Sequence, residues 1–309
     1  MGLFRQDFRT GGPATGFSAG CPRAFHRHCR GREPSAPDLG PGARWPGPGR
    51  TRTLRPPGAA GIGRAGRLDG VSSESHGTDS PFRHESTDRD EARQFVLPLV
   101  ARIEKTAPPA RTDALETAAR AVLVILADER SHGDGAWARA MRDWQDARIR
   151  KVVRRARGAE WRRAGGLPGI TVTGAAAEVR VYPPVPLDGW PKELVKLQVS
   201  GTELDDPLPP ADPDPLRPVL WLNPDVEMSA GKAMAQAGHG AQLAWWELND
   251  TERKAWEADG FALAVRTAPR ERFAALVAAG LPVVRDAGFT EIPAGSATVV
   301  ADHPALRTR

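Results

Sequence analysis

Several features that would assign a protein to a class at first sight are missing from this sequence. Only two of its 309 residues are cysteine, both before residue 30, so no disulfide framework supports a fold. No run of 18 apolar residues is present, which excludes a hydrophobic segment long enough to cross a membrane. The N-terminus also lacks the apolar core of a secretory signal. We therefore expect a cytoplasmic protein without a membrane partner.

Lysine is absent from the first 70 residues, although they contain twelve arginines. Against four acidic residues, these arginines produce a formal charge of +8. Because the whole chain carries +5, the remaining residues together carry −3. The basic excess therefore belongs to the N-terminal segment, and it is not a sign that the rest of the chain binds nucleic acid.

Aliphatic residues are scarce in residues 1–90, which are crowded with glycine, proline, arginine and serine. Such a segment cannot bury enough apolar surface to offset the entropy of ordering, so we predict a disordered tail. Its potential zinc ligands do not have the spacing of a closed structural site. They are Cys21, His26, His28 and Cys29. We predict neither a metal nor a cofactor for this chain.

A helical region is predicted for residues 91–165, where apolar residues recur at helical spacing. Its first segment begins near Phe95, and Pro98 would kink or shorten it. Asp113 and Glu116 resemble a capping box at the start of a second helix.

The third predicted helix, which ends near residue 164, carries two apolar stripes that do not line up. The stripe that begins at Trp137 is rotated by roughly 80° from the later stripe at Val152 and Val153. Either the helix bends near Asp146, or its two halves face different neighbours. The side opposite the later stripe is basic, and a solvated charged face is one interpretation of it. The other is contact with a nucleic-acid backbone through Arg150, Arg154 and Arg157.

Residues 166–213 are expected to contain a β-hairpin and a linker. Ile170–Thr173 and Glu178–Tyr182 alternate apolar and polar residues, which predicts two strands. The run of prolines and aspartates from 205 to 215 predicts a stiff, extended linker. We place a domain boundary near residue 214 and find no sequence repeat.

A separate α/β domain is predicted for residues 214–309. A short apolar strand, Pro218–Leu222, precedes a helix that Ser229 would cap and that runs to about Leu248. The later pattern completes the order β-α-α-β-α-β-β, which fits a small mixed sheet of about four strands with helices on both faces.

The helix that begins after Ser229 places a cation, an amide and an imidazole along one side, at Lys232, Gln236 and His239. Packing alone seldom aligns three such groups, so the row predicts a site, with a solvated polar face as the alternative. The opposite side consists of small residues, which let a helix approach a sheet closely. These are Ala233, Ala237, Gly240, Ala241 and Ala244.

Asp286 follows a second predicted strand, Leu281–Val284. Open α/β sheets bind ligands at the carboxyl ends of their strands, so this carboxylate is a candidate site residue. Thr290, Ser296 and Thr298 supply hydroxyl groups around the turn that follows it.

Two sequence motifs in this region are informative together. The first is Met-Ser-Ala-Gly-Lys-Ala-Met-Ala-Gln-Ala-Gly-His at 228–239, and the second is Asp-Ala-Gly-Phe-Thr-Glu-Ile-Pro-Ala-Gly-Ser-Ala-Thr at 286–298. In this order they resemble the class II peptidyl-tRNA hydrolases, over about residues 217–304. Four departures, which bear on fine geometry and substrate preference, leave the Lys, Gln, His, Asp and Thr positions intact. They are Gly240 for alanine, Met234 for a small residue, Ala294-Gly295-Ser296 for Pro-Gly-Thr, and Asp302-His303 for an apolar-Gly pair.

The resemblance implies an α/β enzyme that hydrolyses, without a metal, the ester joining a peptide or an N-blocked aminoacyl group to tRNA. Asp286 would orient water, and Lys232 would stabilise developing negative charge. The partner would be a peptidyl-tRNA, whose phosphates would meet the basic face described above, and a homodimer is one candidate assembly. The implied catalytic residues are Lys232, Asp286, His239 and Thr290, and the substrate-binding residues are Gln236, Thr298, Ser296, Arg285 and Gly231.

Other chemistries fit the same residues less well. Gly231-Lys232 is not a phosphate-binding loop, because the first glycine of that motif is missing and Ala233 replaces Ser or Thr. A triad of Ser229, His239 and Asp286 has no Gly-x-Ser-x-Gly elbow to present the serine. The rival class is a binding protein that holds tRNA or ribosomal RNA on a hydrolase-like domain without cleaving it.

Overall fold

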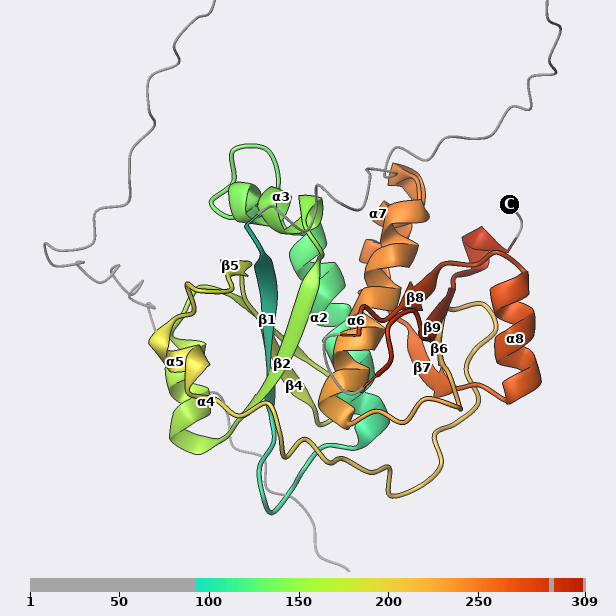
Figure 1. Ribbon diagram of the computed structural model, residues 1–309, viewed down its shortest axis with the longest axis horizontal. Helices are drawn as coiled ribbons and strands as arrows, with labels where there is room; N and C mark the ends of the chain where they lie inside the picture. Colours follow the sequence, from blue (N-terminus) through green and yellow to red (C-terminus); the bar gives the residue numbers. More distant parts are fainter. Residues whose placement is uncertain (1–92, 289–291, 308–309) are drawn as a thin grey trace, which may run out of the picture. The chain divides into compact units, whose positions relative to one another are not determined.

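The described part of the chain, residues 93–288 and 292–307 of a computed structural model, forms two mixed β-sheets (Figure 1). All these residues belong to one compact unit. The tail predicted for residues 1–90, with its cysteines and histidines, lies outside the described residues, and so does Thr290. None of the helices in the described ranges is long and apolar enough to cross a membrane.

The N-terminal half of the described chain builds the first sheet. Its elements are β1 (Phe95–Arg102), α2 (Arg111–Ala127), η1 (Glu129–Ser131), α3 (Ala138–Asp146), β2 (Arg150–Ala156), α4 (Gly158–Gly165), β3 (Ile170–Thr173), β4 (Glu178–Val181), β5 (Val185–Pro186) and α5 (Lys192–Val195). The strand order is β2-β1-β4-β3, with β5 also paired to β1. Strand β1 is parallel to β2 and antiparallel to β4. The predicted hairpin is confirmed as β3 and β4.

The C-terminal half builds the second sheet, in the predicted order of elements. These are β6 (Val219–Leu222), α6 (Ala230–Glu247), α7 (Asp250–Ala258), β7 (Ala264–Thr267), α8 (Arg270–Ala278), β8 (Val283–Arg285), β9 (Ala297–Asp302) and η2 (Pro304–Leu306). The four strands have the order β7-β6-β9-β8. Helix α6 packs on one face of this sheet, and Arg272 of α8 lies over Trp221 on the other. The predicted small mixed sheet with helices on both faces is thereby confirmed.

The two sheets repeat one topology. In each half the first strand is parallel to the second, the fourth is antiparallel to the first, and the third is antiparallel to the fourth. Helix α2 follows β1 as α6 follows β6, and these two helices pack against each other between the sheets (Figure 1). The structure therefore contains a repeat of topology, which the residue pattern did not reveal.

The prediction of a helix at the start of the first half is wrong. Residues 95–102 form β1, which lies inside the first sheet and is buried along most of its length. Pro98 fits in this strand because the pairing with β4 covers only Leu99 to Ala101, and that with β5 only Phe95 and Val96. The Tyr182 N–H, just past the end of β4, donates to the Pro98 carbonyl at 3.1 Å, so the proline keeps one hydrogen bond there and gives up only the reciprocal one at the end of the ladder.

The prediction of one long basic helix to residue 164 is also wrong. Helix α3 ends at Asp146, where the two apolar stripes change direction, and Arg150–Ala156 is the strand β2. The β-branched pair Val152 and Val153 suits a strand, and pairing with β1 outweighs the helical spacing of the charges. The start predicted for the second helix is corrected too, because α2 begins at Arg111 and Asp113 caps a different segment.

Close packing of α6 depends on its small residues. A Cβ atom at Gly240 would lie 2.8 Å from Val299 Cγ1 of β9, and one at Gly238 would lie 2.8 Å from Val122 Cγ2 of α2. Helix α6 also packs against β2, so it contacts both halves of the described chain. This position brings residues of β2 close to the polar row on α6.

Candidate active site

The start of α6 is set by contacts on both sides of the helix terminus. The Ser229 side chain accepts a hydrogen bond from the Lys232 N–H at 3.3 Å, as predicted for the N-cap. The Gly231 N–H donates to Thr202 Oγ1, a buried hydroxyl of the preceding segment, at 3.0 Å. These two contacts satisfy two of the N–H groups that a helix terminus leaves without an intrahelical partner.

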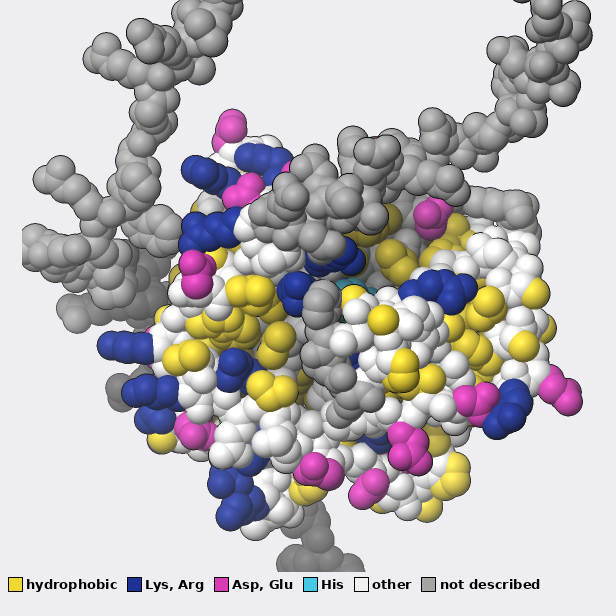
Figure 2. All heavy atoms as spheres, in the orientation of Figure 1, with side chains coloured by type: hydrophobic (Ala, Val, Ile, Leu, Met, Phe, Trp, Pro, Cys, Tyr) yellow, Lys and Arg dark blue, Asp and Glu magenta, His cyan; other side chains and the backbone are white. Residues whose placement is uncertain are grey.

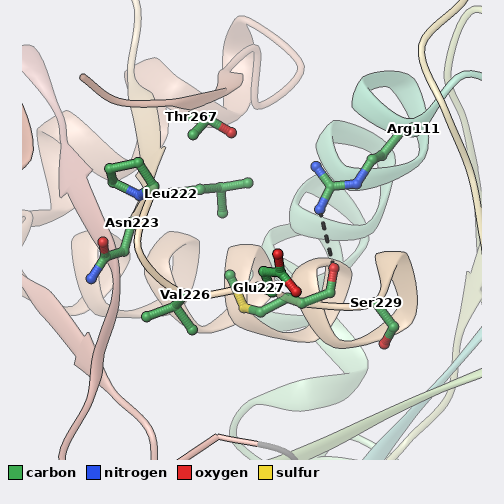
Figure 3. A pocket seen from close by; sticks show the side chains of 9 residues that line it. Arg111, Leu222, Asn223, Val226, Glu227, Ser229 and Thr267 are labelled. Atoms are coloured by element: carbon green, nitrogen blue, oxygen red, sulfur yellow. Dashed lines mark hydrogen bonds between the residues drawn. The ribbon is translucent and has the colours of Figure 1, made fainter. Parts of the chain in front are cut away.

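Two hollows flank this helix terminus. One, of about 700 Å³, lies beside the β6–α6 loop, where Arg111 Nη2 donates to the Met228 carbonyl at 3.4 Å (Figure 3). None of the residues predicted for the site lines it. The other, a cleft of about 590 Å³, lies between β2 and α6 and contains most of them. We therefore take the cleft as the candidate site.

Asp286 and Lys232 meet in this cleft although 54 positions separate them in the chain. Lys232 Nζ lies 2.5 Å from Asp286 Oδ2, and the two side chains are only 15% and 6% exposed. Gln236 Nε2 donates to the same oxygen at 2.8 Å, and the Gly288 N–H donates to Oδ1 at 2.8 Å. The carboxylate is thus paired and held in one orientation.

Thr298 of β9 extends this network into the core. Its fully buried hydroxyl donates to Gln236 Oε1 at 2.6 Å. Because the amide oxygen is engaged there, the amide nitrogen of Gln236 is turned toward Asp286. One glutamine therefore links the sheet to the carboxylate, and the predicted Lys, Gln, Asp and Thr positions form a connected chain.

His239 lies one turn of α6 beyond Gln236 and meets a residue from the other half. Its Nδ1 is 3.1 Å from Nζ of Lys151, which β2 supplies. Burial, and then the positive charges of Lys151 and Lys232, lower the pKa of His239 well below its ordinary value. The imidazole is therefore neutral at physiological pH. Ten residues of helix, about 15 Å of rise, separate it from Ser229, which excludes the Ser-His-Asp triad.

The walls of the cleft are cationic. The basic residues that line it are Arg148, Arg150, Lys151, Lys232 and Arg285, and of the described lining residues only Asp286 is acidic. Lys and Arg side chains gather around a hollow in the face shown in Figure 2. An anionic ligand is the chemical class that such a cleft attracts.

The comparisons with known proteins bear on the second half of the described chain. Residues 216–309 match the family model described as "Peptidyl-tRNA hydrolase PTH2". The peptidyl-tRNA hydrolase of Thermococcus onnurineus (strain NA1) is 35% identical over 97 residues, which cover 28% of this chain and 82% of the relative. This chain belongs to the PTH2 family. The resemblance predicted from two motifs is thereby confirmed.

The PTH2 match begins at residue 216, so the opposite wall of the cleft lies outside it. Arg148 and Lys151 belong to the segment predicted as a basic helix, for which the sequence suggested contact with tRNA phosphates but no contact with the polar row on α6. The signal for Lys151 is the alternation of Ile149, Lys151 and Val153, which puts the lysine on the apolar face only if the segment is a strand.

The remaining predicted residues are distributed unevenly. Arg150 lines the cleft, whereas Arg154 and Arg157 do not. Arg154 instead donates to the carbonyls of Val195 and Leu197 and stacks on a tryptophan ring. Arg285 and Gly231 line the cleft, Ser296 does not, and Thr290 lies outside the described residues. No group of three or more His, Cys, Asp or Glu residues in the described ranges could hold a metal ion.

Proposed function

We propose that this member of the PTH2 family hydrolyses the ester bond between a peptide, or an N-blocked aminoacyl group, and tRNA, and so releases free tRNA for translation. One observation carries the proposal. Asp286, held by Lys232 and Gln236, faces a cationic cleft within the region that matches the family. A cation and a fixed carboxylate in an anion-attracting cleft suit attack of water on an ester attached to a polyanion.

Asp286 orients the attacking water in this proposal. A carboxylate offers about four acceptor positions. Lys232, Gln236 and the Gly288 N–H occupy three of them. The remaining position accepts a hydrogen bond from water and fixes its direction of approach.

Lys232 and the nearby polar groups act on the developing negative charge. Lys232 Nζ lies at the first turn of α6, where the positive end of the helix dipole adds to its charge. His239 is neutral and acts as a hydrogen-bonding group toward the ester or the terminal ribose. Thr290 is assigned a hydroxyl contact from its motif position alone.

The basic wall from β2 positions the tRNA end. Arg150 and Arg148 line the cleft opposite α6, and their charges attract phosphates without reading bases. The predicted basic helix is thus replaced by a basic strand, β2, at the edge of the first sheet. Of the three arginines predicted to contact tRNA, only Arg150 keeps this role.

The experiment is turnover of an N-blocked, radiolabelled aminoacyl-tRNA by the full chain. We expect Lys232→Ala to lower kcat/KM by about 10²-fold to 10³-fold, as when one oriented group at an oxyanion is lost. Lys254→Ala, an exposed lysine on α7, is the matched control and should retain the wild-type rate. Full activity of Lys232→Ala would contradict the proposal. If the wild-type protein binds tRNA tightly but does not cleave the aminoacyl-tRNA, the result would favour a non-catalytic binding protein.

A further inference from the structure

We propose that Lys151, supplied by the N-terminal half, fixes the tautomer of His239, so that Nδ1 accepts a hydrogen bond from the lysine and Nε2 carries the proton toward the cleft. This inference rests on the proposed function for the identity of the ligand in the cleft. It concerns a positioning residue that lies outside the family match.

The surroundings of Lys151 suit an ammonium group. Three acceptors surround its Nζ: Gln242 Oε1 at 2.5 Å, His239 Nδ1 at 3.1 Å and the Ile149 carbonyl at 3.5 Å. The indole face of Trp144 lies 4.9 Å away and adds a cation–π contact. Three acceptors match the three N–H groups of an ammonium, whereas a neutral amine would have only two to donate.

Burial acts in the opposite direction on the same group. Lys151 is 8% exposed, and desolvation lowers its pKa well below the ordinary value. The acceptors and the ring face act against this cost, because each interacts more strongly with the charged form. A neutral amine would instead accept a hydrogen bond from Nδ1–H through its lone pair, and the histidine tautomer would then be reversed. The two protonation states of the lysine thus predict opposite tautomers.

The fold holds Lys151 in place from several sides. Alternation along β2 puts Lys151 and Val153 on the face toward α6. Gln242, fully buried and one turn after His239, presents its amide oxygen to the ammonium. A Cβ atom at Gly238 would lie 3.4 Å from Lys151 Cδ, so this glycine lets the lysine stem pass close to the helix.

The tautomer decides what His239 offers a substrate. With Nδ1 engaged by Lys151, the ring nitrogen left for the cleft is Nε2, which has no hydrogen-bond partner among the described residues. An Nε2–H group donates a hydrogen bond to an ester oxygen or an oxyanion, and it cannot act as a base. The N-terminal half therefore contributes to the chemistry of the PTH2 site through the orientation of one proton.

The test is the tautomer itself, measured by long-range ¹H–¹⁵N NMR on the full chain labelled with ¹⁵N-histidine. His239→Gln identifies the signal among the seven histidines. We expect the wild-type protein to show Nε2–H, and this measurement needs no destabilising variant. An Nδ1–H signal in the wild-type protein would overturn the proposal.

Three variants extend the test. Lys151→Met should abolish the preference for one tautomer and lower kcat by about tenfold while KM changes little, because one oriented hydrogen bond is lost. Lys151→Arg keeps a charged donor and should retain the Nε2–H signal. Lys254→Met on α7 controls for loss of an exposed lysine and should match the wild-type protein. An unchanged tautomer in folded Lys151→Met would contradict the proposal.

This readout is separate from the proposed function. If the wild-type protein shows Nε2–H but does not cleave the aminoacyl-tRNA, the hydrolase assignment fails and the positioning role stands. If it cleaves the substrate and shows Nδ1–H, the positioning role fails and the hydrolase assignment stands.

Discussion

The two halves of the described chain share a topology but differ at the same place in it. In the C-terminal half, the third residue of α6 is Lys232, and it pairs with Asp286, the residue directly after β8. In the N-terminal half, the third residue of α2 is Asp113, and the residue directly after β3 is Gly174. One half therefore has opposite charges facing a cleft, and the other has a carboxylate facing a glycine turn.

The N-terminal counterpart of the site is closed. Asp113 accepts hydrogen bonds from the N–H groups of Ala175, Ala176 and Ala177 at 2.7–2.9 Å. A Cβ atom at Gly174 would lie 2.1 Å from Asp113 Oδ1, so no side chain fits there. The carboxylate thus ties helix α2 to the turn and leaves no room for a ligand.

The later turns of the two helices differ in the same way. The seventh residue is Gln236 in α6 and Thr117 in α2, and the tenth is His239 in α6 and Arg120 in α2. Thr117 is buried, and Arg120 donates to a backbone carbonyl of β3. One topology therefore supports a polar cleft in one half and, in the other, a carboxylate that holds a turn. The side chains at equivalent positions decide which of the two forms, because a fold does not by itself specify a function.

The largest expected effect comes from changing the two aspartates in parallel. Asp286→Asn should lower kcat/KM by about 10²-fold to 10³-fold with little change in stability, because the charge that we propose orients water is lost. Asp113→Asn should leave turnover unchanged and lower the free energy of unfolding by about 1–3 kcal/mol, because the turn loses charged acceptors. Turnover assays and urea unfolding of both variants decide this. Equal effects on activity would show that the two positions are not distinct in role.

The contact between the halves can be tested by adding one methyl group. Gly238→Ala should lower the free energy of unfolding by about 1–3 kcal/mol, because the new Cβ would lie 2.8 Å from Val122 Cγ2 of α2. Gly165→Ala at the end of α4 meets nothing within 4 Å and is the matched control. Urea unfolding measures both. If Gly238→Ala leaves the free energy of unfolding unchanged, α2 and α6 do not pack as closely as the structure has them.

The smallest effect concerns the basic wall that β2 contributes to the cleft. Arg150→Gln should weaken tRNA binding and reduce the slope of log K against log salt by about 1, because one phosphate contact is lost. Arg162→Gln, an exposed arginine on α4 that does not line the cleft, should leave the slope unchanged. Titrations at several salt concentrations measure this. Equal slopes for the two variants would remove Arg150 from tRNA binding.

Much of the C-terminal half could be predicted because its signals are local. Helix α6 begins at a serine cap and shows a clear helical period, and its strands are short apolar runs between turns. The secondary structure of the N-terminal half was harder to predict, because β1 and β2 have apolar spacings that also fit a helix. Proline is rare in central strands, so Pro98 also disfavoured the prediction of a strand. Only pairing across the sheet decides such segments.

The sequence by itself determined the fold of the C-terminal half, the family and the residue types of the candidate site, since helix caps, periodicity and motif order act over a few neighbouring residues. Only the tertiary structure decided that the two halves repeat one topology, that Lys232 and Asp286 lie 2.5 Å apart, and that Lys151 reaches His239 across the cleft. Those facts depend on pairing and packing between segments dozens of residues apart, where tertiary contacts override local propensity.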